Sequence, residues 1–351
     1  MSTSKLIAIA AILILIAAGL CWIQATFLVR TIPGTNASIA EQETYWHDRI
    51  ATLGGDGAYG EFARAIAPLT IDKQHMEAHI FGGALYKAEG IKGVTVCDER
   101  FSQGCFHEFM GETMSNLGIG VLSQLVDACS QEIAPRSYFC THGIGHGLIA
   151  LFGYNEPALN KALAECDKME SKDPVNGCYT GVFMEYNLHI VQNGGGTSPN
   201  TLTDANKLEP CQKLTGTSQW ICYYTRFPLW WYQVLKNQGL TGIDLLKKGR
   251  SMCDEITTKD FRELCYKGIG HYLPVLSDFT PQNILSLCEE TFPEDTYQLF
   301  CRAEAANFLL TENLPDKALA VCAGYTGSSK QYCTAYATHA DEKNILIPEP
   351  L

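Results

Sequence analysis

The chain has 351 residues, of which 46% are hydrophobic and 18% are charged, and its formal net charge at pH 7 is −12. This share of apolar residues is enough for a real core, and the length alone would suggest about two domains unless the chain is built from repeats. The acidic balance, with no block of lysines and arginines, excludes nucleic acid from the expected partners and argues against an anionic lipid surface.

The first predicted element is a membrane anchor. Residues 6–29, which follow Lys5, carry no formal charge and are rich in Ile, Leu and Ala. At ~1.5 Å per residue such a helix spans a hydrocarbon layer of ~30 Å. We interpret residues 1–31 as an uncleaved signal anchor with a short cytoplasmic start, and a cleaved signal peptide is the alternative. Lys5 favours a cytoplasmic N-terminus, although Arg30 weakens this asymmetry.

The cysteines predict both the compartment and a set of disulfides. Fourteen of the 15 cysteines follow residue 96 and form seven close pairs, with 7 to 12 residues between the members of a pair. An even number of cysteines outside the cytosol indicates disulfides, so we expect an extracytoplasmic body, periplasmic or extracellular. The predicted bridges are Cys97–Cys105, Cys129–Cys140, Cys166–Cys178, Cys211–Cys222, Cys253–Cys265, Cys288–Cys301 and Cys322–Cys333.

The same pairs mark an internal repeat, because the step from one pair to the next is 32 to 45 residues. Within each step, Leu and Ala recur three and four residues apart, polar turn residues follow the first cysteine, and a second apolar segment starts at the second cysteine. This pattern predicts an all-α fold, a disulfide-stapled α-solenoid of helix-turn-helix repeats. We expect a juxtamembrane linker with short helices at 32–70, the repeat domain at 71–345 and a tail at 346–351.

The Ala-rich helix pairs with a short disulfide loop, most closely "CDERFSQGCFHEFMGE", resemble those of cysteine-rich tetratricopeptide-like helical repeat proteins. The resemblance covers about residues 70–345. It implies a curved scaffold that binds proteins or peptides on its repeat face, and it does not imply catalysis.

Histidines recur at fixed places in these repeats. Two and six residues after the second cysteine of each pair lie two positions that share one helix face. Five of the nine histidines fall on the 14 positions of this kind, among them His107, His142, His146 and His271. The segment "KQHMEAHIFGG", upstream of the first pair, places His75 and His79 in the same way if Lys73 takes the cysteine position.

These histidines predict a transition-metal site. Two imidazoles four residues apart form a common half-site for Zn, Cu or Fe, and neighbouring repeats could supply the other ligands. The expected ligands are His75, His79, His107, His142 and His146, with His271 a weaker candidate. Glu108, Glu112 and Glu185 are the candidate carboxylate ligands or general bases, and whether the protein is an enzyme stays open.

Two alternatives stand beside the metal site. A repeated packing geometry would also repeat whichever residue satisfies it, and glycines such as Gly143 and Gly145 would let helices approach closely around structural histidines. The protein would then be an interaction scaffold that holds no metal. A redox protein that cycles its cysteines is the other possibility, and it would need an exposed thiol of low pKa.

Overall fold

All regular structure in the described part of the chain is helical, and it contains no strand. The computed structural model describes residues 37–131, 136–169, 177–189, 203, 206–312 and 314–338. The predicted anchor at residues 6–29 and the predicted tail at 346–351 lie outside them. Among the described helices, none combines the length and the apolar character that crossing a bilayer requires.

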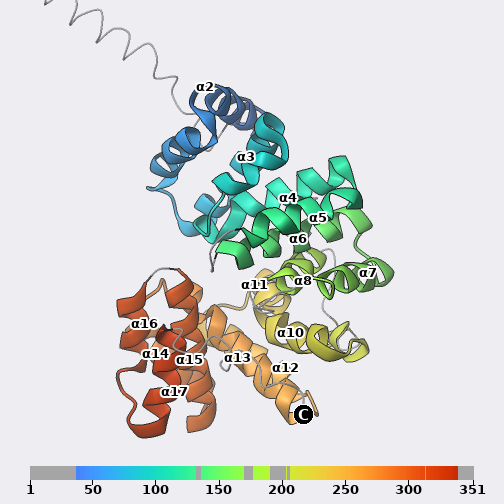
Figure 1. Cartoon of the computed structure of the whole chain (residues 1–351). Coiled ribbons are helices and arrows are strands. Elements are labelled where there is room, and N and C mark those ends of the chain that lie inside the picture. Colours follow the sequence, from blue (N-terminus) through green and yellow to red (C-terminus); the bar gives the residue numbers. More distant parts are fainter. Residues whose placement is uncertain are drawn as a thin grey trace, which may run out of the picture.

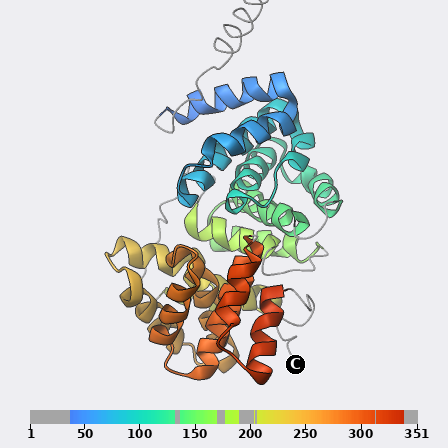
Figure 2. The same cartoon turned by 90° about the vertical axis from the view of Figure 1, so that its left-hand side faces the viewer.

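A central row of helices runs through the molecule, and each helix packs against the next one in the row. Figure 1 shows this row passing from α2 at the top to the C-terminal helices at the lower left, and Figure 2 shows it turned by 90°. The row consists of α2 (Ile39–Ile66), α3 (Ile71–Glu89), α4 (Gly104–Leu117), α6 (Arg136–Phe152), α8 (Cys178–Leu188), α10 (Gly216–Arg226), α13 (Lys259–Leu276), α15 (Asp295–Thr311) and α17 (Gly327–Thr338).

Flanking helices pack against the row between its members. They are α5 (Leu122–Ser130), α7 (Glu156–Cys166), α12 (Gly242–Asp254), α14 (Pro281–Thr291) and α16 (Pro315–Cys322). Short helical segments complete the described part: η1 (Gly90–Val96), η2 (Phe101–Gln103), η3 (Ile119–Val121), η4 (Cys211–Lys213), the π-helical η5 (Phe227–Trp231) and α11 (Tyr232–Asn237).

Seven disulfides join the cysteines in the pairs that their spacing predicted. In α7 and α8, for example, Cys166 is the last residue of the flanking helix and Cys178 is the first residue of the next row helix. Closing such a loop of about ten residues stabilises the fold by roughly 2–3 kcal/mol, because it limits the unfolded chain. Five of the bridges therefore fix a flanking helix to the row helix that follows it, while Cys97 directly follows η1 and Cys211 lies in η4.

The segment predicted to hold a linker and short helices contains the 28-residue helix α2. Ser38 caps this helix by accepting a hydrogen bond from the backbone N–H of Glu41, and Gly54 bends it with a φ of 73°. Trp46 and Phe62 of α2 are buried against Phe81 of α3. The hydrophobic core therefore begins at α2, well before the first cysteine pair.

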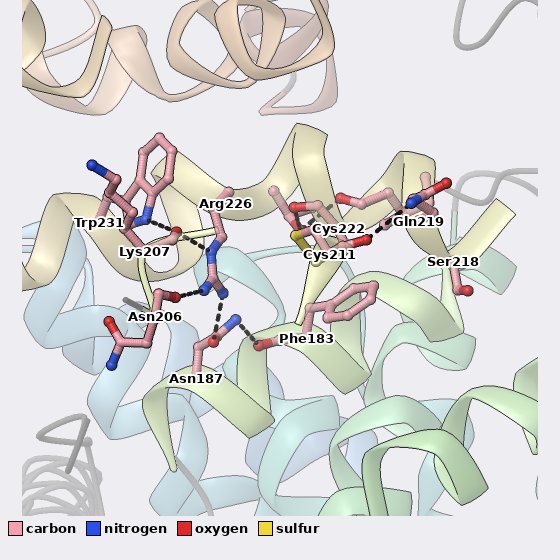
Figure 3. Close-up of a disulfide and its surroundings, with 12 residues drawn as sticks. Phe183, Asn187, Asn206, Lys207, Cys211, Ser218, Gln219, Cys222, Arg226 and Trp231 are labelled. Carbon is pink, nitrogen blue, oxygen red and sulfur yellow. Dashed lines mark hydrogen bonds between the residues drawn. A yellow bond between two sulfur atoms is a disulfide. The ribbon is translucent and has the colours of Figure 1, made fainter. Parts of the chain in front are cut away.

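A buried arginine ties the middle of the row together near the Cys211–Cys222 disulfide (Figure 3). The guanidinium of Arg226 donates hydrogen bonds to the backbone carbonyls of Asn206 and Lys207 and to Oδ1 of Asn187 in α8. The indole of Trp231 donates to the same Lys207 carbonyl. Burial lowers the pKa of Arg226 to about 9. These bonds hold the chain before η4 against α8 and α10.

Candidate metal centre

Five histidines from three neighbouring row helices converge at one place. His75 and His79 lie one turn apart on α3, His107 lies on α4, and His142 and His146 lie one turn apart on α6. Because α4 packs against both α3 and α6, His107 comes between the two pairs. Two groups could each hold a metal ion: His75, His79 and His107 form one, and His107, His142 and His146 form the other, with ligand atoms within 4.8 Å of one another in each.

The spacing of the nitrogens suits coordination. The Nε2 atoms of His75 and His79 are 3.2 Å apart, and Nε2 of His79 is 3.3 Å from Nδ1 of His107. The Nε2 atoms of His142 and His146 are also 3.2 Å apart. A tetrahedral ion with bonds to nitrogen of 2.0–2.1 Å separates its ligands by about 3.3–3.4 Å. The observed separations therefore match the edges of such a coordination shell.

The nature of the short contact between Nε2 of His142 and Nε2 of His146 depends on which ring nitrogens carry a hydrogen. Thr180 donates its hydroxyl hydrogen to the carbonyl of Gly177, so its oxygen accepts a hydrogen from Nδ1 of His142 at 2.8 Å. The buried Glu185 carboxylate accepts from Nδ1 of His146 at 2.9 Å and from the Tyr154 hydroxyl at 2.6 Å. A neutral imidazole with its hydrogen on Nδ1 has a lone pair on Nε2.

Two lone pairs therefore face each other across 3.2 Å between His142 and His146. A proton on one ring would relieve the repulsion, but burial lowers the pKa of both His142 and His146 well below 6.5. A hydrogen on Nε2 of His146 instead would require a protonated Glu185 that donates to Nδ1 of His146 from Oε2 while its Oε1 accepts from Tyr154. A cation between the two Nε2 atoms could bind both lone pairs and would leave the other hydrogen bonds in place.

The two histidines of α3, like those of α6, have partners outside the histidine cluster at their Nδ1 atoms. Nδ1 of His75 donates to the carbonyl of Phe101 at 2.9 Å, and Nδ1 of His79 lies 3.4 Å from Oε2 of Glu108. Burial lowers the pKa of His79 to about 4 and raises the pKa of Glu108 to about 8. His79 is thus neutral at pH 7, which is the form that binds a metal.

The three predicted carboxylates lie in different places. Glu185 on α8 is fully buried behind His146, and Glu108 on α4 lies beside His79. Glu112, one turn after Glu108, is directed to Lys87 of α3, 3.4 Å from its Nζ, and accepts a hydrogen bond from Asn116. Glu185 and Glu108 therefore lie behind or beside the histidines, and Glu112 belongs to a surface ion pair.

A cavity of about 240 Å³ lies beside the cluster and extends to the C-terminal half of the row. His75, His107 and His142 line one end of it, and His271, Phe308 and Glu312 line another part. Burial lowers the pKa of His271 to about 4, and its Nδ1 is buried without a hydrogen-bond partner. His271 belongs to neither of the two histidine groups, but it lines the same cavity.

Glycines let α6 and α8 approach closely enough to build the site. A Cβ atom on Gly145 would lie 2.2 Å from the carbonyl oxygen of Cys178, and one on Gly181 would lie 1.9 Å from that of His142. This close packing brings Thr180 and Glu185 within reach of the α6 histidines. The glycines next to the histidines thus have the packing role that the sequence indicated.

Two partners of the histidines were missing from the predicted site, the Thr180 hydroxyl and the Phe101 carbonyl, and so was the Tyr154 hydroxyl, which donates to Glu185. Thr180 lies two residues after Cys178, the repeat position that His107 and His142 occupy in their own helices. That position could have identified it. Tyr154 and Phe101 lie outside the repeat positions, and no sequence signal points to them.

A comparison with protein-family models, curated proteins and solved structures gives no match to this chain.

Proposed function

We propose that this protein binds a transition metal, Zn, Cu or Fe, through His75, His79, His107, His142 and His146. The observation that carries the proposal is the pair of facing Nε2 atoms on His142 and His146, because Thr180 and Glu185 fix the ring hydrogens on the other side. A divalent ion would also offset the negative charge of the fully buried Glu185 carboxylate, which a set of neutral imidazoles does not.

The cavity supports a function in which the bound ion would also contact water or a small molecule. An ion held by His75, His107 or His142 would face the cavity, and a catalytic metal site keeps such an open position for water or substrate. At about 30 Å³ for each water, the cavity has room for a small molecule. Glu108 would be the carboxyl group beside this ion, whose positive charge would favour its ionised form, whereas Glu185 would orient His146.

We propose that the protein carrying this site is an α-solenoid. It would be anchored to a membrane and would lie outside the cytoplasm. Seven disulfides support an oxidising compartment, and the contacts of each row helix with its neighbours support a repeat architecture. Residues 6–29 would supply the single membrane contact, with the N-terminus in the cytoplasm.

The test is the metal content of the full chain, purified with its disulfides oxidised and incubated with Zn²⁺, Cu²⁺ and Fe²⁺ before dialysis. We expect at least one tightly held ion per wild-type chain, measured by plasma mass spectrometry. The triple variant H79A/H107A/H146A removes two ligands from each group and should lose the ion. His47→Ala on α2 is the matched control, because this side chain is 47% exposed, and it should keep the wild-type content.

Circular dichroism and a free-thiol count would show that the triple variant keeps its helices and disulfides. A metal-free wild type, or a triple variant that retains the full metal content, would overturn the proposal. The histidines would then be structural, and the protein would be an interaction scaffold whose partner binds the repeat face.

A further inference from the structure

The central member of the cluster belongs to both candidate groups. His107 completes a set of three with His75 and His79 on α3, and another set of three with His142 and His146 on α6. This sharing follows from the place of α4 between α3 and α6 in the row. One side chain thus stands where two three-histidine sites meet.

The two nitrogens of His107 have different surroundings. Nδ1 lies 3.3 Å from Nε2 of His79, so this edge of the ring is turned to the α3 pair. Nε2 is buried and has no hydrogen-bond partner. The ring centroid is 4.1 Å from that of His146 and 5.1 Å from that of His142. A buried imidazole nitrogen without a partner is unfavourable unless something binds it, because its contact with water has been lost.

We propose that the cluster is a dinuclear centre in which His107 bridges two metal ions, binding one through Nδ1 and the other through Nε2. This inference rests on the proposed metal-binding function and specifies its stoichiometry. His75 and His79 would complete the ligands of the first ion, and His142 and His146 those of the second. With bonds of about 2.0 Å on each side of the ring, the two ions would be about 6 Å apart.

Bridging changes the protonation of His107 in a defined way. The neutral ring carries one hydrogen on one of its nitrogens, and the other nitrogen is free to bind the first ion. Binding of the second ion displaces that hydrogen as a proton to solvent and leaves an imidazolate shared by two cations. No electron is transferred in this step.

The experiment compares two half-site variants of the full, oxidised chain after loading with Cu²⁺ or Zn²⁺. We expect two ions per wild-type chain, and one in H75A/H79A and one in H142A/H146A, because each variant keeps one group. In the Cu²⁺ form, ions coupled through an imidazolate should give a weaker paramagnetic resonance signal than two isolated ions. Each half-site variant should show the full signal of one uncoupled Cu²⁺.

The result that overturns the bridge is distinct from the one that overturns metal binding. One ion in the wild type, or two ions with the full uncoupled signal, would contradict the bridge and leave a metal-binding protein. No ion in any form would contradict both proposals. His47→Ala is the matched control, since it removes an exposed histidine outside both groups and should keep two coupled ions.

Discussion

At the scale of single residues, the candidate centre depends on groups that would not themselves bind an ion. Thr180 is buried on α8 and does two things at once: it donates to the Gly177 carbonyl and accepts from Nδ1 of His142. The first bond orients the hydroxyl so that the second can fix the tautomer of His142. Outer partners of this kind hold a ligand ring in place and raise its basicity.

Replacing Thr180 by Val tests this role, because the two side chains have nearly the same shape. We expect T180V to keep its fold and to bind metal about 10–100-fold more weakly, as His142 loses the acceptor that fixes its hydrogen. A competition titration with a chelator would measure the change. The control is Thr225→Val, since the Thr225 hydroxyl lines the same cavity but bonds to the Ile221 carbonyl within α10. Equal affinities for T180V and wild type would contradict the role of Thr180.

At the scale of helices, the site depends on how closely α6 and α8 pack. Gly181 of α8 faces the carbonyl of His142, and Gly145 of α6 faces the carbonyl of Cys178. At each of these glycines, the backbone of one helix packs directly against the backbone of the other. Thr180 and Glu185 reach the histidines of α6 because the two helix backbones touch at these glycines.

Gly181→Ala should push α6 and α8 apart. The new Cβ would lie 1.9 Å from a backbone carbonyl, which cannot move aside as a flexible side chain would. We expect a loss of about 1–3 kcal/mol or more in the free energy of unfolding, measured by chemical denaturation, together with weaker metal binding. Gly120→Ala, where a Cβ would meet nothing within 4 Å, should change stability by only about 0.5 kcal/mol. Similar losses in the two variants would contradict the close-packing explanation.

At the scale of the whole molecule, stability should depend on pH through a carboxyl group that is buried outside the histidine cluster. Glu304 of α15 is 1% exposed and accepts a hydrogen bond from Tyr224 of α10, 80 residues earlier in the chain. Burial raises its pKa to about 7, although Lys267 of α13 opposes this. Because the folded pKa is above that of the unfolded chain, the stabilising effect is complete below about pH 4.5 and is lost as the pH rises through about 7.

Glu304→Gln should therefore gain stability relative to the wild type as the pH rises from 5 to 8, by up to about 3 kcal/mol. The comparison has to be made between the two proteins in metal-free buffer. The buried histidines, whose pKa values are lowered, change the stability of both alike and in the opposite direction. Chemical denaturation at several pH values gives the difference. A constant difference across this range would show that Glu304 ionises normally in the folded protein.

The helices and the cysteine pairing could be predicted from the sequence because both are local properties. The members of each disulfide are only 8 to 13 residues apart, and an apolar period of three to four residues is enough to indicate a helix. For the same reason, the two pairs His75/His79 and His142/His146 could each be placed on one helix face. Residues 32–70 were expected to hold a linker and short helices, and the burial of Trp46 and Phe62 of α2 could not be predicted because it depends on contacts with α3.

Only the tertiary structure decided how the candidate centre is assembled. His79 and His146 meet around His107 because of the angles at which α3, α4 and α6 pack, which no local pattern records. The same angles bring Glu185 behind His146 and leave Glu112, one turn beyond Glu108, opposite Lys87. Short-range periodicity determines which residues share a helix face. The distance between faces 30 or more residues apart depends on packing across the whole row.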